Sequence, residues 1–180
     1  MILSLDISTS CTGFCVFDNS GNLIENSAII LSKEKDFFKK ASIAETVIAN
    51  LINRHAITDV AIEESLQSFR PGFSSAKTLL ALSKFNGIIQ YICYKFGVKI
   101  HLYNVNTARK LAGIKINRKL DKSTKDQVLD HVMNSTSIDW PTKVLKSGPN
   151  KGKTVYEKYC YDMADAYVIG RAYCVENMIQ

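Results

Sequence analysis

The order of the elements that the sequence predicts indicates an α/β protein with one mixed sheet and helices on its faces. Two patterns in the 180 residues support this prediction. The first part of the chain alternates short apolar runs with polar turns, which favours an antiparallel meander of three strands. The remainder alternates apolar residues at helical spacing with further short apolar runs, which is typical of helices layered on a sheet. We therefore expect a mixed five-stranded sheet, five helices and a single domain over residues 1–180.

Each predicted strand is a short apolar run that stops at a turn residue or an acid. The first run is apolar on both faces, so we expect it in the centre of the sheet. The tetrapeptide Asn-Ser-Gly-Asn at residues 19–22 is a strong signal for a hairpin turn between the second and third strands. The expected strands are residues 2–7, 13–18, 23–31, 59–64 and 99–105.

The predicted helices combine helical spacing of apolar residues with a polar residue that can cap the first turn. Residues 36–53, with Ile43, Val47 and Leu51 on one face, are an example. The other expected helices run from Ser74 or Ser75 to about residue 96, from Asn106 or Thr107 to 113, from Ser123 or Thr124 to about 133, and over residues 161–175. A long basic insertion, residues 134–159, precedes the last helix, and its segments 142–146 and 153–159 can pair as a hairpin.

The composition is that of a soluble globular protein with a real core. Hydrophobic residues make up 46% of the chain and the mean hydropathy is −0.04. No apolar stretch is long enough to cross a bilayer, and the start has no features of a signal or transit peptide, so we expect a cytoplasmic protein with no membrane partner. The five cysteines are expected to be reduced thiols, and the three histidines share no zinc-type spacing with them.

Basic charge is concentrated in one part of the chain. Of the 23 Lys and Arg residues, 14 lie within residues 95–158, together with five Asp and Glu. Such a segment is the pattern expected of a polyanion binder, nucleic acid in particular. A solvated basic surface explains the charge alone equally well.

Four acidic residues interrupt sequence that otherwise looks buried: Asp6, Glu63, Asp162 and Asp165, here called the acidic cluster. The first two end apolar strands, and the last two are one helical turn apart in the final helix. Burying a carboxylate is costly unless its charge is compensated, and two hard divalent cations held by oxygen ligands would compensate all four. Each acid alone has an ordinary explanation, such as the helix dipole for Asp162, so the hypothesis depends on their combination.

Strand alternation predicts how these carboxylates meet. It places Asp6 on the same strand face as Ser4, and Glu63 on the same face as Ala61. Both neighbours are small, so adjacent strands would leave space above the two acids. The last helix, which is apolar on most sides, could close over that space with its own pair of acids facing the sheet.

The residues around these acids resemble the RuvC-type Holliday-junction resolvases of the RNase H-like superfamily, in a phage or viral-like version. The matching stretches are residues 3–8 with 12–14, 60–63 and 162–166. The resemblance implies an RNase H-like fold and an acidic cluster that binds two divalent ions per site, Mg²⁺ or Mn²⁺. It implies a structure-selective endodeoxyribonuclease that cuts branched DNA, most of all four-way junctions, by hydrolysis of phosphodiester bonds. The products would carry 5′-phosphate and 3′-hydroxyl ends.

The same resemblance implies further roles. Lys125 would stabilise the charge that develops on the scissile phosphate, and Arg109 or Lys110 would be a second such residue. Residues 75–92 would form the face of a homodimer. Phe69, in the loop after the fourth strand, would be a wedge in the junction, although it could equally be a core residue. The basic loop before the fourth helix would hold DNA phosphates through Lys115, Arg118, Lys119 and Lys122.

The sequence departs from the family pattern at three places. Glu64 duplicates the acid that ends the fourth strand, so either glutamate could be the ligand; position favours Glu63. Residues 8–10, Ser-Thr-Ser, replace a turn that commonly contains glycine. The insertion at 142–159 is longer than in many cellular members, and its role is not indicated by the residues themselves.

Two other functions fit part of the sequence. Residues 6–13 also resemble the phosphate loop of actin-like and sugar-kinase-like ATPases, but those proteins need a second domain for the adenine, and this chain has room for one. We therefore expect no nucleotide cofactor. A branched-DNA binding module without cleavage is the other alternative, although binding alone has no need of four converging acids.

Overall fold

A mixed five-stranded sheet forms the centre of the molecule, as the sequence predicts. The structure is a computed structural model that describes residues 1–64 and 76–177. The strands of the sheet are β1 (Ile2–Asp6), β2 (Cys11–Phe17), β3 (Leu23–Ile30), β4 (Asp59–Glu63) and β5 (Lys99–Tyr103). Their order is β3-β2-β1-β4-β5, with β1–β2 and β2–β3 antiparallel and β1–β4 and β4–β5 parallel. The prediction that the first strand is central is confirmed.

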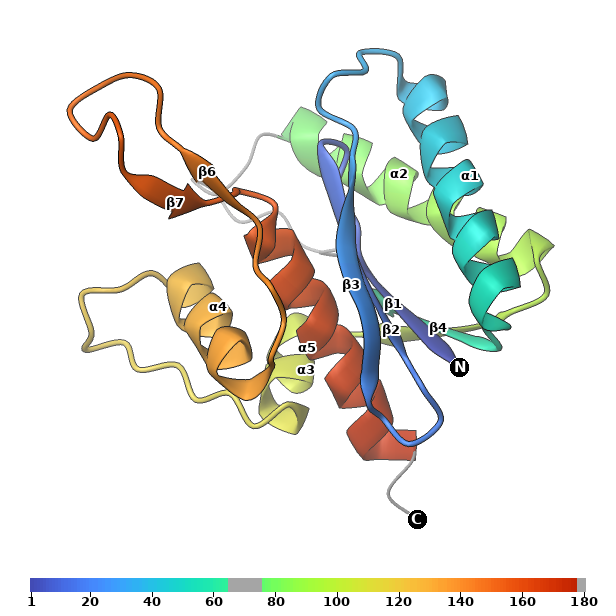
Figure 1. Ribbon diagram of the computed structural model, residues 1–180. Coiled ribbons are helices and arrows are strands. Elements are labelled where there is room, and N and C mark those ends of the chain that lie inside the picture. Colours follow the sequence, from blue (N-terminus) through green and yellow to red (C-terminus); the bar gives the residue numbers. More distant parts are fainter. Residues whose placement is uncertain (65–75, 178–180) are drawn as a thin grey trace.

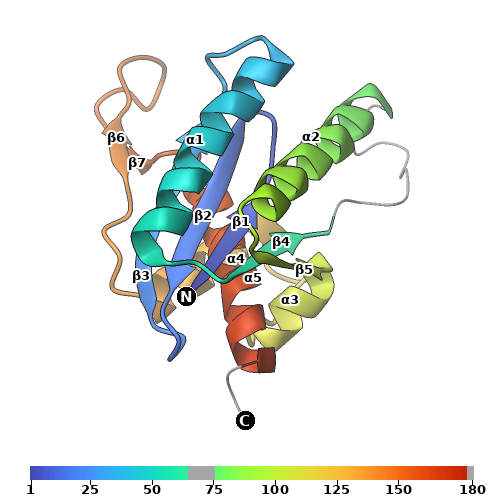
Figure 2. The same ribbon diagram turned by 90° about the vertical axis from the view of Figure 1, so that its right-hand side faces the viewer.

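Helices cover both faces of the sheet (Figures 1 and 2). They are α1 (Phe37–His55), α2 (Ala76–Lys95), α3 (Val105–Leu111), α4 (Thr124–Ser135) and α5 (Cys160–Asn177). The helices α1 and α2 lie on one face, and α5, flanked by α3 and α4, lies on the other. A separate hairpin, β6 (Thr142–Val144) and β7 (Thr154–Tyr156), precedes α5, so the predicted hairpin is confirmed with shorter strands.

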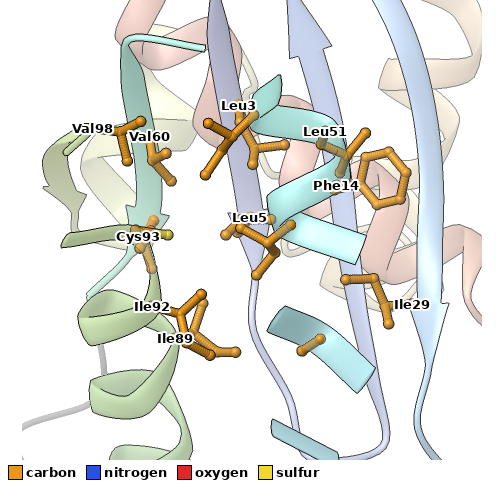
Figure 3. Close-up of a cluster of buried hydrophobic side chains, with 14 of the residues drawn as sticks. Leu3, Leu5, Phe14, Ile29, Leu51, Val60, Ile89, Ile92, Cys93 and Val98 are labelled. Atoms are coloured by element: carbon orange, nitrogen blue, oxygen red, sulfur yellow. The ribbon is translucent and has the colours of Figure 1, made fainter. Parts of the chain in front are cut away.

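Large apolar side chains fill the space between the sheet and the two helices α1 and α2. Leu3 and Leu5 of β1 point into this layer, where they meet residues such as Leu51 of α1 and Ile89 of α2 (Figure 3). Both leucines are fully buried, as is most of the layer. Because successive strand residues point to opposite faces, Ile2 and Ser4 of β1 face α5 instead.

Some predicted boundaries are corrected by local hydrogen bonding. The third helix begins at Val105, earlier than Asn106 or Thr107, because the side chain of Asn104 caps it by accepting from the backbone N–H of Asn106. Strand β5 consequently ends at Tyr103. Ser123 is confirmed as the cap of α4, whereas Ser74 and Ser75, the predicted caps of α2, lie outside the described residues.

Helix α5 packs unusually close to the sheet because two glycines remove side chains from the contact. A Cβ atom on Gly13 of β2 would lie 2.0 Å from the carbonyl oxygen of Asp162. A Cβ atom on Gly170 of α5 would lie 2.1 Å from the ring of Phe17. Neither glycine has a positive φ, so the requirement is space rather than backbone conformation.

All five cysteines are buried and free, which agrees with the prediction of reduced thiols. Within the described residues, no helix has both the length and the apolar character needed to cross a membrane.

Candidate active site

The two strand acids lie next to each other at the carboxyl end of the parallel pair β1–β4. The register pairs Ser4 with Ala61 and Leu5 with Ile62, so the next residues of the two strands are Asp6 and Glu63. Ser4 and Ala61 have no exposed surface, which confirms that the small neighbours lie under the packed helix α5. The predicted arrangement of these two acids is therefore observed.

Helix α5 brings the other two acids to the same place. Asp162 lies in its first turn and Asp165 lies one turn later, where the close contact at Gly13 holds the start of α5 against β2. The side chain of Asp165 is 13% exposed. Three separate elements thus supply the acidic cluster, and the other three members are each close enough to Asp6 to raise its pKa.

The four carboxyls are harder to ionise here than in water. Burial raises the pKa of Asp6 well above its ordinary value, and the charges of its three partners in the acidic cluster raise it further. Burial, followed by the charge of Asp165, raises the pKa of Glu63 to about 7. Burial also raises the pKa of Asp162 and of Asp165. Mutual repulsion of buried carboxylates is the electrostatic condition that a bound cation relieves.

The donor set fits a hard divalent cation, because it consists of four partly buried carboxylates. In the part of the chain that the structure describes, however, no three His, Cys, Asp or Glu side chains already stand together as a closed set of metal ligands. The carboxylates lie near one another without forming a coordination shell.

Two cationic residues face the acidic cluster. Arg109 Nη2 lies 3.8 Å from an oxygen of Asp165, and its side chain is 19% exposed. Its Nε is buried and has no hydrogen-bond partner among the described residues. Lys125, in the first turn of α4, has a charge that lowers the pKa of every member of the cluster. The sequence left Arg109 and Lys110 as alternatives for this position, and Arg109 is the one that contacts the cluster.

The predicted basic residues between α3 and α4 form a surface next to Arg109. A hollow of about 350 Å³ there is lined by Arg109, Lys110, Lys115 and Arg118. Lys119 is exposed in the adjoining turn. Lys122 forms an ion pair with Asp130, so part of its charge is already neutralised. These positions agree with a phosphate-binding surface, whereas the predicted wedge Phe69 lies outside the described residues.

The geometry favours Glu63 over Glu64 as the fourth acid. Glu63 interacts electrostatically with Asp6, Asp165, Arg109 and Lys125. Glu64 lies on the α2 side, where it helps to line a small hollow of about 110 Å³ that Asp6, Glu63 and Asn86 also reach. The backbone N–H of Glu64 donates to the carbonyl of Tyr103, which continues the pairing of β4 with β5.

Three residues that sequence reasoning missed hold the site in place. The Cys11 thiol donates a hydrogen bond to Asp162, and burial raises the pKa of this thiol. Asn86 is buried in α2, and its Nδ2 donates to the carbonyl oxygen of Glu63 at 3.1 Å. Tyr161 Oη donates to Asp126 Oδ1 at 2.7 Å, which joins the residue beside Asp162 to the residue beside Lys125. Asn86 could have been predicted, because it is a polar residue in an otherwise apolar helix. No local sequence pattern indicates the roles of Cys11 and Tyr161.

Comparison with known proteins identifies the fold. No family model matches the chain. A curated relative, the crossover junction endodeoxyribonuclease RuvC of Solidesulfovibrio magneticus, is 28% identical over 106 residues. That match covers 57% of this chain and 60% of the relative, less than two thirds of its length.

Solved structures match over nearly the whole chain. RuvC of T. thermophilus in complex with a Holliday junction substrate superposes with a TM-score of 0.66 at 12% identity, covering 98% of this chain and 96% of that one. The yeast mitochondrial Holliday junction resolvase Ydc2 gives a TM-score of 0.59 at 15% identity, covering 97% of this chain and 77% of that one. The resemblance drawn from the sequence is therefore confirmed for the architecture: this chain has the fold of the RuvC-type resolvases.

Proposed function

We propose that this protein is a metal-dependent endonuclease that cuts four-way DNA junctions. The observation that carries the proposal is the acidic cluster, in which four partly buried carboxylates from three elements meet beside Arg109 and Lys125. The fold shared with RuvC supports the same conclusion, as does the partial sequence match to that protein. A protein that only binds DNA gains nothing from four repelling carboxylates.

In this proposal each group has a defined task. The acidic cluster holds two divalent cations, Mg²⁺ or Mn²⁺, and Glu63 rather than Glu64 is the ligand from β4. Bound cations would supply an activated water and stabilise the charge on the leaving oxygen. Lys125 and Arg109 neutralise charge that develops on the scissile phosphate, because their side chains already face the carboxylates. Hydrolysis joins the water oxygen to phosphorus and breaks the bond to the 3′ oxygen, which leaves 5′-phosphate and 3′-hydroxyl ends.

The basic surface between α3 and α4 would position the DNA. Its hollow beside Arg109 is large enough for a phosphate group and is lined by four cationic side chains. Contacts of this kind fix the orientation of the duplex without reading its sequence, and they make binding depend on salt. Lys122 would contribute less than the others because Asp130 competes for it.

A homodimer would supply one active site for each of two opposed strands, which matches the two-fold symmetry of a four-way junction. Large apolar residues exposed on α2 support this part of the proposal. Leu80 is 57% exposed, Tyr91 is 62% exposed and Tyr94 is 73% exposed. Such residues on one helix favour burial against another protein surface. The cytoplasmic location that the sequence suggests stays a prediction.

The experiment that tests this function is cleavage of a labelled four-way junction beside a linear duplex of matched sequence. Each substrate is incubated with Mg²⁺, with Mn²⁺ or with EDTA, and Asp6→Asn is the variant that removes one proposed ligand. We expect paired nicks in opposed strands of the junction, only with a cation and only with the unaltered protein. Tight binding without nicks in any cation would support the binding module instead. If the protein neither binds nor cuts, the proposal fails and nucleotide binding is the next property to measure.

A further inference from the structure

Among the described residues, the β6–β7 hairpin, residues 142–156, stands apart from the sheet and its helices (Figures 1 and 2). It projects from the end of the molecule at which α5 begins, and the first turn of that helix carries Asp162. The register pairs Thr142 with Tyr156 and Val144 with Thr154. Nothing in the proposed chemistry uses this hairpin, so its surface needs its own explanation.

The turn of the hairpin carries positive charge that no acid offsets. Lys146, Lys151 and Lys153 lie in or beside the turn, and all three are exposed. The only acid between residues 142 and 158 is Glu157, which forms a 2.8 Å ion pair with Lys143 at the base. Among the described residues, no ion pair involves the three lysines of the turn. A merely solvated surface usually mixes both signs of charge, whereas this one does not.

The base of the hairpin is joined directly to the element that carries two of the four acids. The backbone N–H of Glu157 donates to the carbonyl of Pro141 at 2.8 Å, which closes the base. The thiol of Cys160, the first residue of α5, donates to the same carbonyl at 3.4 Å. The N–H of Met163 donates to the carbonyl of Tyr159 at 3.0 Å. The position of the hairpin is therefore fixed relative to Asp162.

One face of the hairpin also exposes an aromatic and an apolar side chain. Tyr156 is 51% exposed and Val144 is 55% exposed, and the register makes them diagonal neighbours on the same face. A tyrosine among lysines is suited to DNA, since its hydroxyl can donate to a phosphate and its ring can pack on a sugar or base. The charge and the missing acids favour DNA over an acidic protein, because a duplex offers regularly spaced phosphates to an extended strand pair.

We propose that the β6–β7 hairpin is a DNA-binding arm that holds the phosphate backbone of a duplex beside the cut, separately from the surface between α3 and α4. This inference rests on the proposed function, since it assigns a partner to a second surface of the same protein. Five residue-to-residue steps separate Glu157 from Gly152, and at ~3.3 Å each they extend on the order of 17 Å. At ~3.4 Å per base pair, the lysines of the turn would contact the duplex roughly five base pairs from the scissile phosphate.

The test measures binding of a four-way junction in EDTA, where no cleavage occurs, over a series of salt concentrations. The variant changes Lys146, Lys151 and Lys153 together to Ser. The matched control changes the same three residues to Arg, which preserves charge. A second pair compares Lys151→Ser with Lys99→Ser, because Lys99 is exposed at the opposite end of the sheet. Circular dichroism of each variant shows whether the fold is kept.

We expect the triple Ser variant to bind about 10- to 100-fold more weakly at moderate salt. The slope of its log affinity against log salt concentration should be smaller in magnitude by about 3, whereas the Arg control should keep the affinity and the slope of the unaltered protein. Shortening the junction arms to four base pairs beyond the cut should weaken the unaltered protein but not the Ser variant, because that variant no longer uses the distant phosphates. Lys99→Ser should match the unaltered protein.

Two results would overturn the proposal that the hairpin is a DNA-binding arm. One is a triple Ser variant whose affinity and salt dependence equal those of the unaltered protein. The other is an Arg control that loses as much affinity as the Ser variant. The failure of the proposed function looks different, because in that case the unaltered protein itself would not cut the junction in any cation. Cleavage by the unaltered protein together with an unaffected Ser variant would reject the hairpin arm alone.

Discussion

The two faces of the central sheet are packed in different ways, although they share the same strands. The face under α1 and α2 is filled by large apolar residues such as Leu3, Leu5 and Phe14 (Figure 3). The face under α5 uses small residues, with Ser4, Gly13 and Ala61 at the contact. Close-packed large side chains contribute most of the burial energy, whereas small ones allow a helix to approach the sheet. The first face stabilises the fold, and the second places the carboxylates of α5 beside those of β1 and β4.

The largest effect should come from removing one carboxylate of the second face. Glu63→Gln removes a proposed ligand while it keeps the shape of the side chain. We expect junction cleavage to fall by about 100-fold or more, since even residues that only support metal ligands cost about 10- to 100-fold. Glu64→Gln is the control, because that side chain lies on the α2 side, and it should retain cleavage within a few-fold. Equal losses in the two variants would contradict the assignment of Glu63.

Substitution of one glycine on each face compares the packing of the two faces directly. Gly13→Ala places a methyl group 2.0 Å from the carbonyl of Asp162, so α5 must shift. We expect a loss of about 1–3 kcal/mol in the free energy of unfolding together with a loss of cleavage. Gly87→Ala in α2 meets nothing within 4 Å. It should raise the free energy of unfolding by about 0.5–1 kcal/mol, because alanine favours a helix over glycine. Urea unfolding measures the change in the free energy of unfolding for both variants. A Gly13→Ala variant with unchanged stability and cleavage would show that the close contact is not required.

The carboxylates should make the metal-free protein less stable as pH rises. The pKa of Glu63 is raised from an ordinary value of 4.5 to about 7, so the folded protein holds this proton more tightly than the unfolded chain. Its stabilising contribution is full below about pH 4.5 and is lost as pH rises through about 7. Urea unfolding in EDTA at pH 5.5 and 7.5 measures the change, and Glu63→Gln should reduce it. A stability that instead rises over this range in the unaltered protein, and not in the variant, would contradict the burial of this carboxyl.

The smallest effect on cleavage should come from removing the hydrogen bond between α4 and α5. Tyr161→Phe removes the bond to Asp126, which fixes Lys125 relative to Asp162. We expect about 10-fold slower cleavage at saturating DNA with little change in affinity, and a stability loss of about 1 kcal/mol. Tyr173→Phe, which removes a hydrogen bond to Asp59 at the opposite end of β4, is the control. A change in affinity alone would show that Tyr161 does not position Lys125.

The two faces also differ in how far the sequence predicts them. Alternation and apolar runs were enough for the strands, for the central place of β1 and for the approach of Asp6 to Glu63, because these follow from local periodicity. The choice of Arg109 over Lys110 was not predictable, since it depends on the direction in which α3 leaves β5. The bond of Cys11 to Asp162 joins residues that are far apart in the chain, so no local pattern indicates it. The importance of Gly13 likewise depends on a helix that packs against it only after folding.

The central claim is that the four residues of the acidic cluster together bind divalent cations and that their carboxylates repel one another without them. Thermal unfolding of the unaltered protein and of Asp6→Asn, each in EDTA and in Mg²⁺ or Mn²⁺, tests this claim without DNA. Removing a buried charge should raise the Tm in EDTA, and a cation that binds only the folded state should raise the Tm of the unaltered protein much more than that of the variant. The claim would be contradicted if Asp6→Asn unfolded at a lower temperature in EDTA and the cation shifted both proteins equally.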